Sequence, residues 1–265
     1  ASTSKSYPND SVTIYLDPIP TTGDITVKVV DSETGSVISG ASVSGASRSG
    51  STNSSGYAYF YDVPFGSYTF TASKSGYYSD TSTASISLSD MTDSITIYLD
   101  PIPTEGDITV KVVDSGTGRV ISGASVSGAS RSGTTNSSGL AYFYDVPFGS
   151  YTFTASATGY YSNTGTASIS LSDMTDTITI YLDLIPTSGD ITVYVKDKDT
   201  GSAISGASVL GGGRSGTTNS SGYIKFTELD FGSYTFTASA EGYVSGTGSA
   251  SISVTATDKT ITIYL

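Results

Sequence analysis

The sequence predicts an all-β protein composed of tandem, seven-stranded antiparallel β-sandwiches, and two observations support this. The first is the stretch VPFGSYTFTAS at residues 63–73, in which Tyr68 and Phe70 alternate with hydroxyl side chains. An apolar residue at every second position is typical of a strand with one buried face. The second is that this stretch returns at 146–156 and, as LDFGSYTFTAS, at 229–239.

The whole chain repeats with one period. The Gly-Asp pair that ends at Asp24 returns at Asp107 and at Asp190, so each copy starts 83 residues after the one before it. A copy of this length is a small domain that can bury one thin core. We therefore expect three β-sandwich repeats, at residues 21–103, 104–186 and 187–265.

Within the first copy, alternation and turn residues predict about seven short strands and no helix. The strands that can be read directly are 25–31, 40–45, 57–63, 66–73, 83–88 and 95–99. A loop through Arg48 leads to a turn at Asn53-Ser54-Ser55-Gly56. Frequent turn signals between short strands are typical of an antiparallel sandwich.

Comparison of the three copies separates the core from the surface. The inward side of 57–63 is apolar in every copy, whereas Tyr59 and Tyr61 become Tyr142 and Tyr144 in the second copy and a lysine and a threonine in the third. We expect these four tyrosines to be exposed, as candidate partner contacts, because a ring offers a large area with a polar tip. Stacking on a sugar, or a plain surface strand rich in tyrosine, are the alternatives.

Residues 1–20 match the end of a copy followed by a linker. Shifted by one period, SVTIYLDPIP at 11–20 lies over SITIYLDPIP at 94–103. Val12, Ile14 and Leu16 form one apolar face, which must be covered. We interpret this segment as an orphan closing strand. Either it is a donor strand that adds to a sheet in a neighbouring subunit, giving head-to-tail polymers, or it belongs to a longer run of repeats.

Two proline-containing segments, 100–106 and 183–189, join the copies. Proline restricts φ and favours an extended path, so we expect a semi-rigid rod. Carboxylates lie at these segments, and carboxylate oxygens are ligands for Ca²⁺. The first segment has Asp100, Glu105 and Asp107, but the second has one carboxylate fewer, so solvated charge is favoured over calcium and no cofactor is expected.

The composition argues against several functions. The chain has no Cys, His or Trp, so it has no disulfides and no thiol or imidazole metal ligands. Its formal net charge of −12 argues against nucleic acid as a partner. No apolar run approaches the length of a membrane span. Dense Ser, Thr and Gly with few charged residues favour an extracellular or cell-surface protein.

Catalysis is not expected. Without His and Cys, general acid–base or nucleophilic work would fall to carboxylates, lysines and tyrosines. The recurring carboxylates, such as Asp24, Asp31 and Asp62, lie at strand ends and turns once in every copy. Turn chemistry explains them better than a catalytic site copied three times.

Four sequons for N-glycosylation begin at Asn9, Asn53, Asn136 and Asn219, the last three in the same turn of each copy. The alternative is that asparagine simply suits a turn. The Ser/Thr-rich edges are further candidates, for O-glycans.

The pattern GDITVKVVDSETGSVISGASV, followed by TNSSGYAYFYDVPFGSYTFTASKSGY, resembles the carboxypeptidase regulatory-like domain, a transthyretin-like and Ig-like β-sandwich. The resemblance covers nearly the whole chain and implies an accessory, surface or stalk module without catalysis. Pilins with a related sandwich often carry a Lys–Asn isopeptide bond. Lys28 and Lys111 match that lysine, but the third copy has Tyr194 and the last strands contain no Asn, so this bond is not expected.

Together these observations favour a structural subunit of an extracellular filament, pilus-like fibre or surface stalk. It would polymerise with copies of itself through strand addition and tyrosine contacts. The alternative is an adhesin or a carbohydrate-binding spacer module of a larger secreted protein, with a polysaccharide as partner.

Overall fold

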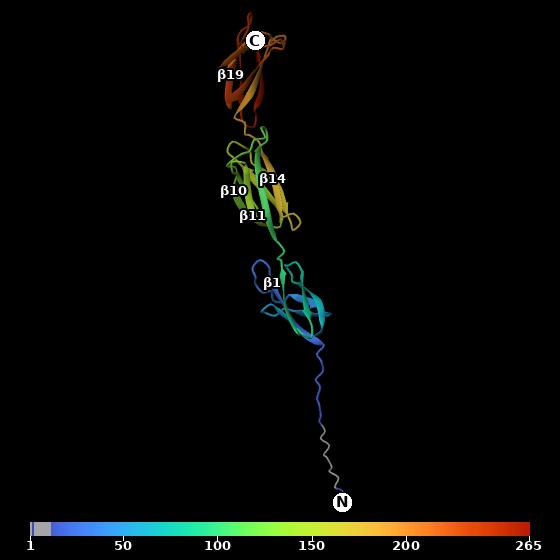
Figure 1. The fold of residues 1–265 in the computed structure, drawn as a ribbon. Helices are drawn as coiled ribbons and strands as arrows, with labels where there is room; N and C mark the ends of the chain where they lie inside the picture. Colours follow the sequence, from blue (N-terminus) through green and yellow to red (C-terminus); the bar gives the residue numbers. More distant parts are fainter. Residues whose placement is uncertain (1, 3–11) are drawn as a thin grey trace. The chain divides into compact units, whose positions relative to one another are not determined.

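The computed structural model describes residue 2 and residues 12–265, and these residues form strands and turns (Figure 1). Each copy folds into a sandwich of two layers, one sheet of three strands and one of four. The tandem all-β architecture predicted from the sequence is confirmed. In this part of the chain no helix is long and apolar enough to cross a membrane.

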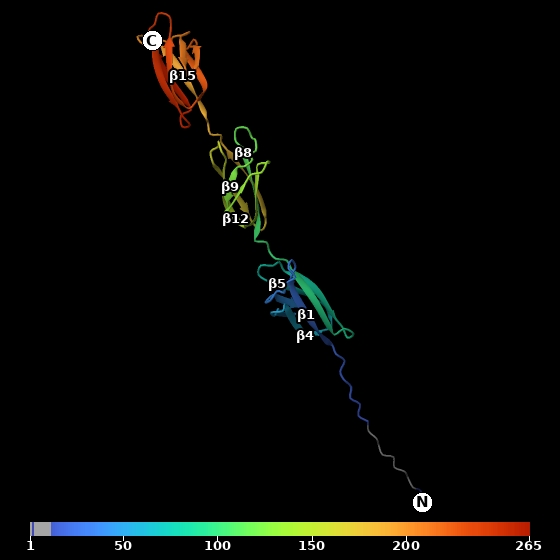
Figure 2. The same ribbon diagram turned by 90° about the vertical axis from the view of Figure 1, so that its left-hand side faces the viewer.

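In the first sandwich, the three-stranded sheet has the order β4-β1-β7 and the four-stranded sheet the order β3-β2-β5-β6. Figure 2 shows β1 and β4 side by side. The strands are β1 Thr22–Asp31, β2 Ser42–Gly45, β3 Arg48–Ser51, β4 Tyr57–Pro64, β5 Gly66–Ser73, β6 Asp80–Ile86 and β7 Thr92–Leu99.

The other two sandwiches repeat this topology. The second contains β8 Glu105–Asp114, β9 Ser125–Gly128, β10 Arg131–Thr134, β11 Leu140–Pro147, β12 Gly149–Ser156, β13 Asn163–Ile169 and β14 Thr175–Leu182. The third contains β15 Ser188–Lys196, β16 Ser208–Gly211, β17 Arg214–Thr217, β18 Tyr223–Asp230, β19 Gly232–Ser239, β20 Gly246–Ile252 and β21 Asp258–Tyr264.

Strand pairing is antiparallel, as predicted, except between the first and last strands of each sandwich. β1 pairs with β7 in parallel, with Val27 opposite Ile95 and Val29 opposite Ile97. The pairs β8–β14 and β15–β21 are also parallel. The reason lies in the connection: β5 and β6, which belong to the four-stranded sheet, come between β4 and β7 in the chain. The last strand therefore returns through a long crossover of the kind that parallel neighbours require.

Two phenylalanines and a set of aliphatic residues fill each core. In the first sandwich, Phe60 of β4 and Phe70 of β5 meet with ring centroids 4.9 Å apart. Alternate residues of β1, namely Ile25, Val27 and Val29, are buried in the same cluster. Burial of each such side chain stabilises the fold by about 1.5–3 kcal/mol.

The segment that the sequence predicts as a loop through Arg48 is instead the strand β3, paired with β2. A two-residue turn, Ala46-Ser47, joins the two strands, and both residues have positive φ, 51° and 57°. Hairpin turns of this kind usually carry Asn-Gly or Gly-Gly, so Ala-Ser concealed the hairpin. The third copy has Gly212-Gly213 here, with φ of 60° and 71°. This pair is the sequence signal from which the hairpin could have been predicted.

Backbone hydrogen bonds hold the start of each proline-containing segment against the sandwich that it leaves. Tyr78 N donates to Asp100 O, and Ile102 N donates to Gly76 O, both at 2.9 Å. Ser32 Oγ also donates to Asp100 Oδ1 at 2.5 Å. The second sandwich repeats the two backbone bonds, from Tyr161 N to Asp183 O and from Ile185 N to Gly159 O.

Candidate interaction surfaces

The outer face of the first three-stranded sheet carries a row of tyrosines along its edge strand β4. Tyr57, Tyr59 and Tyr61 stack, with neighbouring ring centroids 6.2 Å apart. Tyr59 is 50% exposed and Tyr61 59%. Tyr142 and Tyr144 of β11 repeat the stack at 6.0 Å and are exposed as well. The four tyrosines therefore face outward, and their contact with a partner stays a prediction.

The third sandwich replaces this row with a charged pair. Lys225 and Thr227 take the places of the two tyrosines in β18, and Lys225 Nζ lies 2.7 Å from Asp190 Oδ2. Their hydrogen bond lowers the pKa of Asp190 and raises the pKa of Lys225. The stacked tyrosine row is thus a feature of the first two sandwiches.

The outer face of each four-stranded sheet is covered with hydroxyl groups. The strand register carries them in rows, such as Ser49, Ser44, Thr71 and Thr81 across β3, β2, β5 and β6. The equivalent positions of the second sandwich are also all serine or threonine, and the third sandwich differs only at Leu210. In the first sandwich the outward residues of the four strands are Ser42, Ser44, Ser49, Ser51, Ser67, Thr69, Thr71, Ser73, Thr81, Thr83 and Ser85.

This hydroxyl face has no charged side chain, and each of its groups can both donate and accept hydrogen bonds. Ser67 Oγ and Ser85 Oγ bond each other at 2.9 Å. The copies exchange serine and threonine, as between Thr83 and Ser249, yet keep the hydroxyl. Threonine is enriched in strands but serine is not, so strand propensity explains only the threonines of this face. A neutral, hydrogen-bonding partner or solvent layer suits it.

An arginine bridges the two sheets on the β3–β4 side of each sandwich. Arg48 donates from β3 to the carbonyl oxygens of Tyr61 and Asp62 in β4, the latter at 2.8 Å. These carbonyls lie in a β-bulge, where Asp62 has a φ of 53° and its N–H donates to Asp24 Oδ1 at 3.0 Å. A bulge and a charged side chain at an edge strand hinder pairing with another chain, so this edge is protected.

The arginine and its acceptors recur in every copy. Arg131 donates to the carbonyl oxygens of Tyr144 and Asp145, and Arg214 donates to those of Thr227 and Glu228. The sequence prediction missed this bridge. Its signal was the return of arginine at the same period, at a position that was interpreted as a loop.

A second recurring cluster fixes the turn after the first strand. Asp31 Oδ1 accepts from Thr34 N at 2.8 Å, and Asp31 Oδ2 accepts from Tyr77 OH at 2.9 Å. The bond from Thr34 and then that from Tyr77 lower the pKa of Asp31, and the latter bond raises the pKa of Tyr77. The pairs Asp114–Tyr160 and Asp197–Tyr243 repeat the contact. These aspartates hold a turn.

Three of the carboxylates at the two proline-containing segments have partners of their own. Asp107 Oδ1 accepts from Asp145 N at 3.1 Å, and Asp100 and Asp190 have the contacts given above. Among the residues that the structure describes, no three His, Cys, Asp or Glu side chains gather as metal ligands would.

Lys28, which matches the isopeptide lysine of pilins, lies on β1 opposite Thr96 of β7. Its Nζ is 5.7 Å from the centroid of the Tyr57 ring. Thr96 has no side-chain amide with which an isopeptide bond could form.

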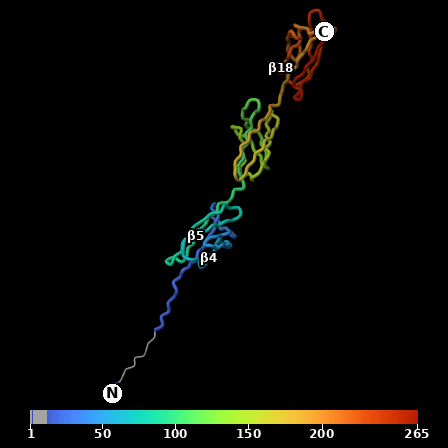
Figure 3. Tube along the Cα trace, turned by 90° about the vertical axis from the view of Figure 1, so that its right-hand side faces the viewer, coloured from blue at the N-terminus to red at the C-terminus, as the bar shows by residue number. Residues whose placement is uncertain are grey.

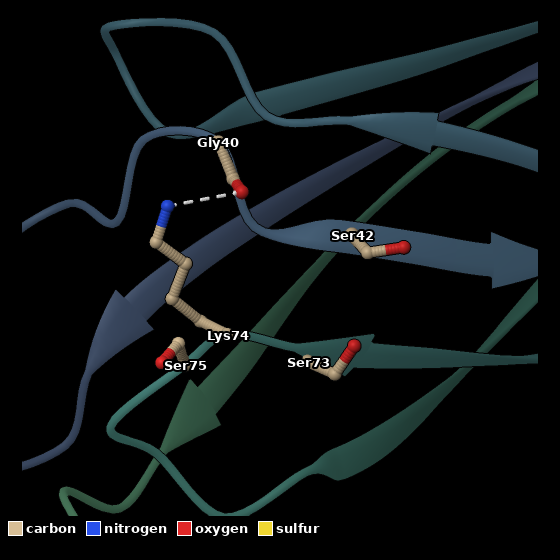
Figure 4. Close-up of a pocket in the computed structure, with 5 residues that line it drawn as sticks. All are labelled: Gly40, Ser42, Ser73, Lys74 and Ser75. Carbon is tan, nitrogen blue, oxygen red and sulfur yellow. Dashed lines mark hydrogen bonds between the residues drawn. The ribbon is translucent and has the colours of Figure 1, made fainter.

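A shallow hollow beside β2 and β5 is lined by Gly40, Ser42, Ser73, Lys74 and Ser75 (Figure 4). Lys74 Nζ donates to the carbonyl oxygens of Ser39 and Gly40, at 2.9 and 3.1 Å. The second and third copies have alanine in place of this lysine. The hollow is therefore not a recurring site.

Residues 12–20 form no strand and pair with none in the described part of the chain (Figure 3). Val12, Ile14 and Leu16 are 81%, 76% and 88% exposed. The residues one period later are Ile95, Ile97 and Leu99, and the last two are 1% and 0% exposed in β7. A sequence that is buried in β7 is therefore exposed in the leading segment.

Three of the four sequons lie in turns that the structure describes. Asn53, Asn136 and Asn219 are exposed in the turns before β4, β11 and β18. Asn9 lies outside the described residues.

The fold defines the class of protein, a tandem array of two-layered β-sandwich modules. Residues 24–99, 107–183 and 190–265 each match the family model of the carboxypeptidase regulatory-like domain. The chain therefore belongs to this family, as its sequence pattern indicates. A search of curated proteins gave no significant match.

Several solved structures are similar over most of the chain. The Bacillus anthracis TIE protein is 19% identical with a TM-score of 0.48, and the match covers 92% of this chain and 51% of that one. The streptococcal ancillary pilin is 13% identical with a TM-score of 0.32, covering 91% and 98%. The major pilin subunit of Bacillus cereus is 12% identical with a TM-score of 0.30, covering 91% and 99%. The chain thus spans about half the length of the TIE protein.

Proposed function

We propose that this chain is a structural subunit of an extracellular filament, pilus-like fibre or surface stalk, and that it joins other copies of itself head to tail. The observation that carries the proposal is the leading segment, residues 12–20. It has the sequence of a last strand and a linker, but no partner strand among the described residues. A segment with an exposed apolar face gains free energy when a sheet covers it.

The third sandwich of a second copy is the proposed acceptor. Its last strand β21 lies parallel to β15, with Thr262 opposite Tyr194. The segment TITIYL at 260–265, which contains the end of this strand and the residue after it, is nearly the same as VTIYL at 12–16, so the leading segment can replace β21 with little change in the core. The mechanism is strand exchange, because each described sandwich already contains its own last strand.

The linker residues that follow the donor strand would add contacts. In the first sandwich, Asp100 and Ile102 bond the backbone of residues 76–78. The equivalent loop of the third sandwich is residues 242–244, where Val244 is 84% exposed. Residues 17–19 of the incoming chain would bond this loop in the same way.

Sedimentation velocity over a range of protein concentrations tests the proposal. The full chain should form oligomers that grow with concentration. The double variant Ile14→Asp with Leu16→Asp should remain monomeric, because the two carboxylates would be buried without partners. Tyr15→Asp, which changes the opposite side of the same strand, is the matched control and should still assemble. A full chain that is monomeric at every concentration would overturn the proposal.

The hydroxyl faces favour a second candidate, a module that binds a neutral polysaccharide. Sugar hydroxyls offer both donors and acceptors, which matches these faces, and the tyrosine rows offer stacking rings. Binding to microcrystalline cellulose and to chitin is the test. Loss on Tyr59→Ala with Tyr61→Ala assigns binding to the tyrosine row, and loss on Thr69→Lys with Thr71→Lys assigns it to the hydroxyl face. Absence of binding to both solids removes this candidate.

A further inference from the structure

The three turns of sequence Thr-Asn-Ser-Ser-Gly, at 52–56, 135–139 and 218–222, are built alike. In each turn the threonine is 4% exposed and the asparagine is exposed. Thr52 Oγ1 donates to Ile38 O at 2.6 Å and accepts from Ala41 N at 2.8 Å. The threonine thus fixes the turn from within, and the asparagine beside it projects outward.

The asparagine uses only one end of its amide. Asn53 Oδ1 accepts from the N–H groups of Ser55 and Tyr57, at 2.9 and 3.1 Å. Asn136 and Asn219 repeat both bonds within 0.1 Å. Both partners are donors, so the atom that faces the backbone must be the oxygen. The Nδ2 atom is then at the end of the amide that faces away from these N–H groups. In none of the three copies does it form a hydrogen bond with another described residue.

We propose that Asn53, Asn136 and Asn219 are sites of N-glycosylation. The acceptor chemistry requires an exposed asparagine with a hydroxyl residue two positions later, and Ser55, Ser138 and Ser221 supply it. The anomeric carbon of a lipid-phosphate-linked oligosaccharide forms the new bond to Nδ2. The bond from that carbon to the phosphate oxygen breaks, the lipid phosphate leaves, and the transferase takes up the Nδ2 proton.

The glycan and the turn do not compete. The turn depends on Oδ1, and the sugar takes Nδ2, so both Oδ1 bonds remain after modification. One asparagine can therefore shape the turn and carry a glycan. The interpretation as a turn residue and the interpretation as a glycosylation site are thus compatible.

Asn163 is the internal contrast. It begins Asn-Thr-Gly, which has no hydroxyl two positions later, and its Nδ2 donates to Tyr181 O at 2.8 Å. Asn163 therefore lacks the sequence that N-glycosylation requires, and its amide nitrogen is already hydrogen-bonded.

The test is secretion of the full chain from a yeast, followed by mass spectrometry of its peptides. Hexose-bearing glycans are expected on the three turn asparagines and not on Asn163. Ser55→Ala should remove only the glycan at Asn53 and leave the melting temperature unchanged, since the Oδ1 bonds go to backbone N–H groups. Asn53→Asp should also remove it while keeping the oxygen acceptor.

Folded, secreted protein with all three turns unmodified, alongside a glycosylated reference protein from the same culture, would overturn the inference. Glycans on Asn163, or at Asn53 in the Ser55→Ala variant, would do so too. The inference requires export alone and is independent of head-to-tail assembly. Failure of one therefore leaves the other standing.

Discussion

Phe70 shows how strictly single residues are specified in these cores. Its ring is fully buried, and a Cβ built on Gly45 would come within 2.5 Å of it. Gly128 and Gly211 stand in the same relation to the phenylalanines of the other copies, at 2.5 and 2.2 Å. The glycine in the GASVSG motif is thus required by packing and not by its backbone angle.

Truncation of this ring tests the core. Phe70→Ala should destabilise the first sandwich by about 3–5 kcal/mol, since it removes buried area and leaves a cavity. Thr69→Ala, one residue away on the hydroxyl face, should change stability by no more than about 0.5 kcal/mol. Hydrogen exchange of peptides from the first sandwich measures both variants. Equal effects would show that β5 does not present these two faces as described.

Asp31 makes the stability of the turn depend on pH. Its pKa is lowered in the folded state, so its charged form stabilises the fold above the unfolded pKa of about 3.9. This contribution is lost as the pH falls through the lower folded pKa. Asp31→Asn should therefore lower the melting temperature at pH 7, and the difference from the unaltered chain should shrink near pH 2.

Glu33→Gln, in the same turn, is the control and should have little effect at either pH. A difference for Asp31→Asn that is as large in acid as at pH 7 would show that the charge of Asp31 is not what stabilises the turn.

At the scale of elements, alternation predicted most strands because each has one face in the core. The prediction failed where this signal was weak. β3 has the sequence RSGS, with Gly50 as its inward residue, so nothing marks it as apolar. The strand predicted at 83–88 is β6, Asp80–Ile86, and Leu88 is exposed in the following turn. The parallel pairing of β1 with β7 could not be predicted, since local sequence does not encode the direction of a distant neighbour.

The arginine bridge belongs to this scale because it closes one side of the sandwich. Arg48→Ala should free the carbonyl oxygens of Tyr61 and Asp62 and expose the β4 edge. We expect faster hydrogen exchange in β3 and β4 and more light scattering on concentration. Arg119→Ala, at an exposed turn position, is the control. Unchanged exchange and scattering in the Arg48 variant would contradict the protective role.

For the whole molecule, the sequence predicted the repeat, the four outward tyrosines and the unusual leading segment, because comparison of the internal copies separates fixed from variable positions. The hydroxyl faces could be predicted from the sequence only in part. Alternation places Thr69 and Thr71 on one side of β5, but the rows across four strands depend on register. The Arg48 bridge depends on a bulge that alternation cannot predict.

The central claim is that residues 12–16 of one chain act as the last strand of the third sandwich in another. Because the chain has no cysteine, two single-cysteine variants can report on this directly. The register of β15 with β21 places residue 262 opposite Tyr194, and Thr13 corresponds to residue 262. Thr13→Cys mixed with Tyr194→Cys under mild oxidation should therefore give a disulfide-linked pair. Thr13→Cys with Ser44→Cys, on the other sheet, should give only background, and equal cross-linking in both mixtures would contradict the claim.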